Sequence, residues 1–107
     1  MRREQLKGHL DLLILSVLSR GPAHGYAVIT DLKDRSDGAF DLAEGTIYPA
    51  LHRLEELRLV RSRWAEVGGR RRRVYELSGA GANALRERRQ EWTQFVAGVE
   101  AIVAWAP

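Results

Sequence analysis

EGTIYPALHRLEEL, residues Glu44–Leu57, is the stretch that decides the fold of this 107-residue chain. Its apolar residues recur at steps of three and four, which predicts an amphipathic helix with one face in a core. That face consists of Ile47, Leu51, Leu54 and Leu57. The polar face consists of Thr46, Pro49, His52, Arg53 and Glu56. Because a helix of this kind is usually just a solvated surface helix, its role has to be inferred from its neighbours.

Pro49 lies inside this helix, although proline normally breaks a helix interior because its ring crowds the carbonyl four residues back. The residue at that position is Gly45, which lets the first turn bend at low cost. In the same turn, the Thr46 hydroxyl or backbone N–H groups can meet a phosphate.

A β-hairpin is predicted after this helix, around the two-residue loop Gly68-Gly69. Counting outward from the loop fixes the register. One face pairs Trp64 with Arg73, Ser62 with Tyr75 and Val60 with Leu77, and the other pairs Arg61 with Glu76, Arg63 with Val74 and Ala65 with Arg72. We therefore expect Val60, Tyr75 and Leu77 to join the core, and the Arg73 guanidinium to stack on the Trp64 ring.

The basic excess of the chain is concentrated in this hairpin. Residues 60–77 hold six arginines and two glutamates, a net charge of +4, so the rest of a chain with net charge +3 carries −1. The four consecutive arginines Arg70, Arg71, Arg72 and Arg73 repel one another, and exposed ion pairs return only about 0–1 kcal/mol each. A solvated charge run is one interpretation. We favour contact with the phosphates or minor groove of a nucleic acid.

Two helices and a very short strand are expected before residue 44. The first helix, Leu6–Arg20, is apolar over most of its circumference, so it has to be covered on two sides. The second runs from about Gly25 to Lys33 or Arg35, with Tyr26, Ile29 and Leu32 as its buried positions. The alternation in Ala39–Leu42 predicts the strand.

A long last helix is predicted from Gly79 toward Trp105, with Ser78 as its N-cap. A heptad seam is formed by Leu85, Trp92, Val99 and Ala106, with Phe95 and Ile102 at the intermediate positions and Arg88 as a polar first layer. At 1.5 Å per residue this helix is on the order of 40 Å long, more than a domain of this size covers. Its apolar stripe is best buried against another subunit.

The composition, with 45% hydrophobic and 29% charged residues, fits one ordinary soluble domain with a modest core. The absence of cysteine excludes disulfides and thiolate chemistry and fits a reducing cytosol. No segment approaches the roughly 18 apolar residues of a membrane span. Basic residues before an apolar run imitate a signal peptide, but Asp11 within that run argues against export, so we expect a cytoplasmic protein.

Enzymatic chemistry has little support in the sequence. His9, His24 and His52 show no metal-ligand spacing, and Gly79-Ala80-Gly81 lacks the third glycine of a nucleotide-binding motif. We therefore expect no catalytic residue, no metal and no cofactor. His24 is interpreted as a turn or packing residue, and His52 as the better candidate for an intermolecular contact.

Three stretches in this order resemble the PadR family of bacterial transcriptional regulators, in its short branch with a single C-terminal helix. They are GPAHGY at Gly21–Tyr26, EGTIYPALHRLE at Glu44–Glu55, and GRRRRVYELS at Gly69–Ser78 with Gly81. The resemblance implies a mainly α fold with a small β-hairpin wing, in which a winged helix-turn-helix over residues 1–77 and a C-terminal dimerisation helix over residues 78–107 form one compact unit.

The resemblance also implies a sequence-specific DNA-binding regulator, a homodimeric repressor that a signal or small molecule releases from a pseudo-palindromic operator in double-stranded DNA. The implied DNA contacts are Thr46, Tyr48, Pro49, His52 and Arg53 in the recognition helix and Arg70, Arg71, Arg72 and Arg73 in the wing. The implied dimer interface consists of Leu85, Trp92, Phe95, Val99 and Ile102. Trp92 further corresponds to an aromatic residue that lines a pocket for planar hydrophobic effectors, although a tryptophan in this position is also commonly packed core.

The chain departs from the family at both ends of the recognition helix. Arg58 stands where members often have glycine, and a left-handed backbone there would be strained. Ala43 replaces the usual serine or threonine, which predicts a weak N-cap. A winged helix used only for protein contacts, with the arginines on an acidic partner, is the alternative function.

Overall fold

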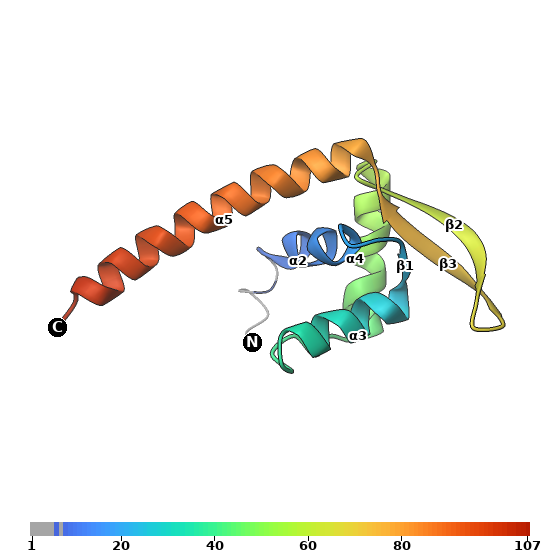
Figure 1. The fold of residues 1–107 in the computed structure, drawn as a ribbon, viewed down its shortest axis with the longest axis horizontal. Helices are drawn as coiled ribbons and strands as arrows, with labels where there is room; N and C mark the ends of the chain where they lie inside the picture. The colour runs from blue at the N-terminus through green and yellow to red at the C-terminus, as the bar shows by residue number, and fades with distance from the viewer. Residues whose placement is uncertain (1–5, 7) are drawn as a thin grey trace.

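The computed structural model describes residue 6 and residues 8–107 (Figure 1). The element order in this part of the chain is α2 (Leu10–Leu18), β1 (Ala23–His24), α3 (Gly25–Arg35), α4 (Glu44–Glu56), β2 (Val60–Val67), β3 (Arg70–Leu77) and α5 (Gly79–Trp105). The three N-terminal helices form a body from which the β2–β3 hairpin and α5 project in different directions. The predicted winged helix-turn-helix with a long C-terminal helix is confirmed.

The core forms where α4 meets α2 and α3. The α4 side chains of Ile47, Leu51 and Leu54 are fully buried, as the sequence predicted, and Ala50 joins them. Ile14 and Leu15 of α2 are also fully buried. The helix α2 is covered by α3, α4, α5 and β3, and this explains why its sequence is apolar over most of its circumference.

Several predictions of detail are wrong. Leu57 is 56% exposed because it follows the last turn of α4, and Tyr26 is 49% exposed because Val28 takes the buried position of α3 instead. The expected first helix is shorter, since residues 8 and 9 form a turn before α2 and Ser19 and Arg20 follow it; within the expected range, residue 7 lies outside the described part. Ala106 caps the end of α5 and does not continue its seam.

Ala39–Leu42 forms turns and irregular backbone where a strand was expected, and a strand that the sequence did not predict occurs earlier. This strand is β1, whose two residues pair antiparallel with β3, Ala23 with Tyr75 and His24 with Val74. The sheet order is therefore β1-β3-β2. Pairing with β1 fastens the base of the hairpin to the start of α3.

The hairpin Val60–Leu77, which we call the wing, has the predicted register at every pair from Val60–Leu77 to Val67–Arg70. Gly68 and Gly69 have φ angles of 59° and 78°, the left-handed pair of a type I′ turn, which L-residues with a side chain rarely adopt. Val60 and Tyr75 lie in the core as expected.

The end of α4 is joined to the start of α5. Arg58 has a φ of 63°, and the N–H groups of Arg58 and Leu59 donate to the carbonyls of Glu55 and Leu54, as in a Schellman C-cap. The Ser78 hydroxyl donates to the Arg58 carbonyl and accepts from the Gly81 N–H, so the predicted N-cap is confirmed.

Gly81 allows the closest approach in this junction. A Cβ at Gly81 would overlap the backbone carbonyl of Leu59. The start of α5 can therefore pack against Leu59 only because residue 81 has no side chain.

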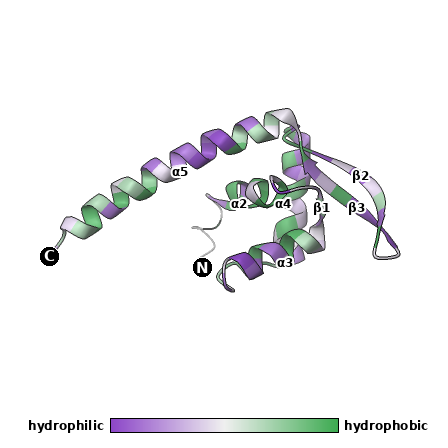
Figure 2. Ribbon diagram, viewed as in Figure 1, coloured by the Kyte–Doolittle hydropathy of each residue, from purple (hydrophilic) through white to green (hydrophobic). Residues whose placement is uncertain are grey.

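Hydropathy changes along α5 (Figure 2). Its first turns are pale to green, its middle turns are strongly hydrophilic, and the part that extends beyond the body is largely apolar. Within residues 8–107, no helix combines the length and apolar character that crossing a membrane requires.

Candidate nucleic-acid interface

The exposed face of α4 carries most of the side chains predicted to contact DNA. Pro49, His52 and Arg53 are exposed, while Thr46 and Tyr48 are partly buried at the two edges of this face. Pro49 is accommodated inside the helix, and the space around Gly45 is open. Ala43 provides no side-chain cap; its carbonyl instead accepts from the N–H groups of Thr46 and Ile47. As at any helix start, the first N–H groups of α4 have no acceptor within the helix.

Tyr48 takes its position from the preceding helix. Its ring lies so close to the backbone of Gly25 that a Cβ there would overlap the ring. Burial raises the pKa of the Tyr48 phenol, and the negative charge of Glu44 raises it further. The ring centroid lies 6.5 Å from that of His52, so these two aromatic side chains form one continuous edge of the α4 face.

One face of the wing is tied to α4 by a polar network. Arg73 Nε donates to the Ser62 hydroxyl at 2.9 Å, the Ser62 hydroxyl donates to Glu55 of α4, and the Arg73 guanidinium lies 4.0 Å from the same carboxylate. Arg73 is also 5.5 Å from the Trp64 ring centroid, which confirms the predicted stacking. Arg73 is thus held against the protein.

Arg72 is held on the opposite face of the wing. Its guanidinium lies 5.7 Å from the ring centroid of Tyr26, at the start of α3. Hydrogen bonding to the Glu44 carboxylate raises the pKa of the Tyr26 hydroxyl, and the charge of Glu44 adds to this shift. A cation and an anion thus flank Tyr26 where the wing, α3 and α4 meet.

The two arginines nearest the tip are the exposed ones. Arg70 and Arg71 are exposed, whereas Arg72 and Arg73 are half-buried. The Arg71 guanidinium lies 5.1 Å from the Trp64 centroid, on a ring that is itself exposed. The arginine run predicted to contact DNA therefore divides into two exposed cations at the tip and two that also hold the wing against the body.

His24 is the N-cap of α3, whereas the sequence analysis interpreted it as a turn or packing residue. Its Nδ1 accepts from the Ala27 N–H at 3.4 Å. Burial lowers the pKa of His24, and the nearby Arg72 charge lowers it further, so the neutral ring that can accept this hydrogen bond is favoured.

Arg53 does not extend freely from α4. It forms an ion pair and hydrogen bond with Asp11 of α2, and Arg88 of α5 reaches the same carboxylate. Sequence periodicity gave no signal for this contact, because Asp11 and Arg53 are 42 positions apart.

The apolar stripe of α5 is exposed in the single chain. Of the five residues predicted for a dimer interface, Leu85 is buried in the core of its own chain. Trp92, Phe95, Val99 and Ile102 are 43–64% exposed. An apolar surface of this kind on a projecting helix indicates an interaction surface.

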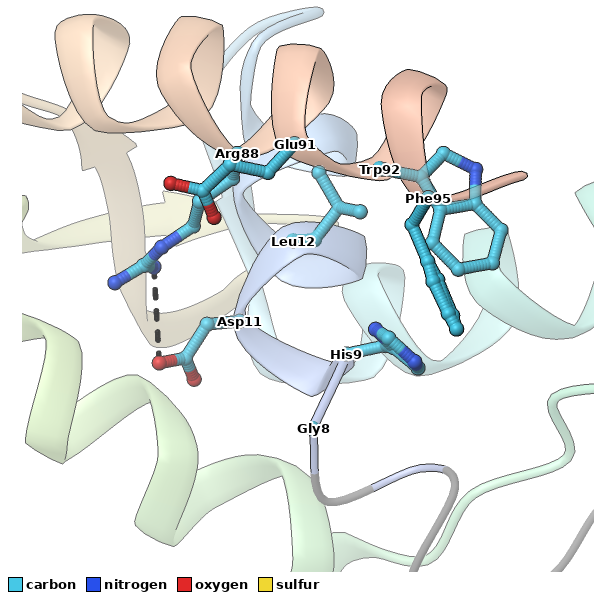
Figure 3. A pocket seen from close by; sticks show the side chains of 8 residues that line it. All are labelled: Gly8, His9, Asp11, Leu12, Arg88, Glu91, Trp92 and Phe95. Carbon is cyan, nitrogen blue, oxygen red and sulfur yellow. Dashed lines mark ion pairs between the residues drawn. The ribbon is translucent and has the colours of Figure 1, made fainter. Parts of the chain in front are cut away.

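A cavity of about 300 Å³ lies between α5 and the start of α2 (Figure 3). It is lined by Gly8, His9, Asp11, Leu12, Arg88, Glu91, Trp92 and Phe95. The His9 and Trp92 rings meet edge-to-face with centroids 5.0 Å apart, and the Trp92 and Phe95 centroids are 6.1 Å apart. Trp92, the residue predicted to line an effector pocket, thus borders a cavity, together with His9 and Arg88, which that prediction did not include.

Metal binding finds no support in the described part of the chain. No group of three or more His, Cys, Asp or Glu side chains there is arranged to hold a metal ion.

Comparison with known proteins identifies relatives over most of the chain. The model of the transcriptional regulator PadR-like family matches residues 14–87. The transcriptional regulator Rv3488 of Mycobacterium tuberculosis is 38% identical over 88 residues, covering 82% of this chain and 79% of that protein.

The fold is also similar to that of solved structures. A transcriptional regulator from Clostridium thermocellum has a TM-score of 0.85 at 26% identity, covering 94% of this chain and 98% of its own. A PadR family transcriptional regulator from Eggerthella lenta has a TM-score of 0.82 at 33% identity, covering 96% of this chain and 88% of its own. The similarity thus extends well beyond the matched family region.

Proposed function

This chain belongs to the PadR-like family of transcriptional regulators, and we propose that it represses transcription as a homodimer bound to a pseudo-palindromic operator. Members of the family are DNA-binding regulators and not enzymes, in agreement with the prediction from the sequence. The observation that carries the proposal is the position of the arginine-rich wing, which the Glu55–Ser62–Arg73 network holds beside the exposed face of α4.

In the proposed complex, α4 lies in the major groove. Thr46, Tyr48, Pro49, His52 and Arg53 face the bases and the adjoining phosphates. Arg70 and Arg71 at the wing tip contact phosphates or the adjacent minor groove, while Arg72 and Arg73 contribute positive charge and fix the direction of the wing. Such a protein acts in the cytoplasm, where it has access to the chromosome.

The second copy of the chain covers the apolar stripe of α5. Trp92, Phe95, Val99 and Ile102 are the interface residues that remain exposed, and a twofold axis through them presents two α4 helices to one side of a duplex. Phe95→Asp places a charge in this stripe, so sedimentation should show a monomer. Glu91→Asp, a conservative change one turn away, is the control and should leave a dimer.

The cavity beside Trp92 is the proposed effector site. Aromatic rings from Trp92 and Phe95 suit a planar hydrophobic molecule, and His9 and Arg88 at its margin suit a hydrogen-bond acceptor or an anionic group on that molecule. Release of DNA on effector binding is the expected response of a repressor.

The test begins by selecting bound fragments from the source genome with purified protein. The expected result is a pseudo-palindrome with half-site centres about 10–10.5 base pairs apart. On such a duplex, replacing both Arg70 and Arg71 with glutamine removes four guanidinium groups from the dimer, so the slope of log affinity against log salt should fall by about 3.6, because each phosphate contact contributes roughly 0.9.

Replacing both Arg86 and Arg89 of α5 with glutamine removes the same charge far from the wing and is the matched control. Equal slopes for the two double variants would exclude the wing tip from the contact. Failure to select any duplex, even at low salt, would favour the alternative in which the arginines bind an acidic protein.

A further inference from the structure

Asp11 in the first turn of α2 links three helices through one carboxylate. Its Oδ1 accepts a hydrogen bond from Arg53 Nη2 of α4, and its Oδ2 lies 3.7 Å from Arg88 Nη1 of α5. Figure 3 shows Arg88 directed at Asp11 from above the cavity. The Asp11 side chain is only 25% exposed, so both of its oxygens are engaged in a partly desolvated position.

Arg88 holds Asp11 in place. Its Nη1 is buried and, among the described residues, has no hydrogen-bond partner, so the ion pair with Asp11 is what compensates its charge. Because Oδ2 of Asp11 faces Arg88, the carboxylate is oriented so that Oδ1 faces Arg53. The two guanidinium groups and one carboxylate leave a net charge of +1, so this cluster still attracts DNA.

Arg53 is fixed by one terminal nitrogen. Its side chain is 51% exposed, and in the described part of the chain Asp11 is the acceptor found for it. The other N–H groups of the planar guanidinium therefore point in a direction set by Asp11. Reading guanine through O6 and N7 needs two adjacent donors presented together, and an arginine already oriented loses less rotamer freedom on binding.

We propose that Asp11 is a positioning residue for DNA recognition: its carboxylate orients Arg53 for a bidentate contact with one base, and so adds sequence selectivity without touching DNA. This assigns a function in DNA recognition to a residue outside both the recognition helix and the wing.

The test compares the affinity for the selected operator duplex with that for an unrelated duplex of equal length. Asp11→Asn removes the charge but keeps the shape, and it should reduce the preference for the operator about tenfold, at the same base position as Arg53→Gln. The double variant should lose no more than Arg53→Gln alone. Asp11→Glu retains a carboxylate and should restore part of the preference.

Asp34→Asn makes the same change in net charge at the end of α3 and is the matched control, which should leave the preference unchanged. Thermal unfolding and sedimentation check that each variant is folded and keeps the oligomeric state of the parent. Side-chain NMR of the free protein gives an independent readout, since rotation of the Arg53 guanidinium should be slow in the parent and fast in Asp11→Asn.

Three results would overturn the proposal. Asp11→Asn could strengthen binding to both duplexes by the same factor, and Asp11 would then be only a negative charge near DNA. The losses from Asp11→Asn and Arg53→Gln could multiply in the double variant, which would mean that the two residues act separately. A freely rotating Arg53 guanidinium in the parent would exclude the orientation on which the proposal depends.

Discussion

Replacing Arg58 with glycine should stabilise this protein. Arg58 has a φ of 63° directly after α4, in the left-handed region where a Cβ crowds the following carbonyl oxygen. Glycine removes that Cβ and keeps the backbone bonds of the Schellman cap, in which the Arg58 N–H donates to Glu55 at 2.9 Å and the Leu59 N–H donates to Leu54 at 3.0 Å.

The size of the gain follows from two opposing effects. The left-handed conformation costs a residue with a side chain about 1–2 kcal/mol. Glycine also gives the unfolded chain more freedom, which returns about 0.4–1 kcal/mol of that gain. The net stabilisation is therefore about 1 kcal/mol, equivalent to a rise in Tm of roughly 4–8 °C for a domain of this size.

The assay is thermal unfolding followed by circular dichroism at one fixed protein concentration, because the Tm of an oligomer depends on concentration. Arg58→Ala is the control that removes the long side chain but keeps the Cβ, and it should leave Tm nearly unchanged. Asp37, after α3, has a φ of 54° and tolerates this conformation better, so Asp37→Gly should gain less. If Arg58→Ala raised Tm as much as Arg58→Gly, the strain would lie in the side chain and the argument from φ would be refuted.

Two further substitutions and one pH dependence test contacts around the interface. Gly81→Ala should destabilise the protein by about 1–3 kcal/mol in chemical denaturation, because the new methyl group overlaps the Leu59 carbonyl and α5 has to move. Gly25→Ala should displace the Tyr48 ring and weaken operator binding in a fluorescence anisotropy titration, at a smaller cost in stability because the overlapped atoms are the far end of a side chain. Burial holds the pKa of His24 below its unfolded value, so its contribution to stability is present above about pH 6.5 and is lost as pH falls through the folded pKa; Tm measured between pH 7.5 and 5 should show this decline.

Each of these has an outcome that contradicts it. Gly79→Ala, in open space at the start of the same helix, is the control for Gly81→Ala, and equal effects would mean that the Leu59 contact is unimportant. Unchanged operator affinity in Gly25→Ala would remove Tyr48 from the DNA-facing surface. His24→Asn can still cap α3 but does not titrate near neutral pH, so an undiminished pH dependence in this variant would assign the effect to other groups.

The register of the hairpin was predictable in full, whereas the third strand of the sheet, β1, was not. A two-residue loop leaves a single way to count outward, and the alternation of residues on both sides agrees with it. The strand Ala23–His24 is too short to show any periodicity, and only its pairing with β3 defines it. The wrong strand at Ala39–Leu42 came from the converse problem, because four alternating residues had no partner strand to pair with.

The sequence predicted which helix or strand carries each residue of the candidate site. It did not predict which side chains these residues contact. Helical periodicity placed His52 and Arg53 on the outer face of α4, where they lie. That Arg53 bonds Asp11 depends on how α2 crosses α4, which no local pattern specifies. The error at Tyr26 has a similar cause, since the apolar pattern of α3 fits two neighbouring faces and only the position of α4 selects the one with Val28.

The short junction at Ser78 couples the direction of α5 to that of the wing. A single residue separates β3 from α5, and the Ser78 hydroxyl and the contact of Gly81 with Leu59 also fix the start of α5 to the turn that precedes β2. An eight-residue strand is about 26 Å long at roughly 3.3 Å per residue. A tilt of about 5° in α5 therefore sweeps the wing tip through roughly 2 Å, which is enough to separate a guanidinium from a phosphate at hydrogen-bonding distance. On the proposed function, we expect repacking at the far end of α5 to change the contact between the wing and DNA in this way.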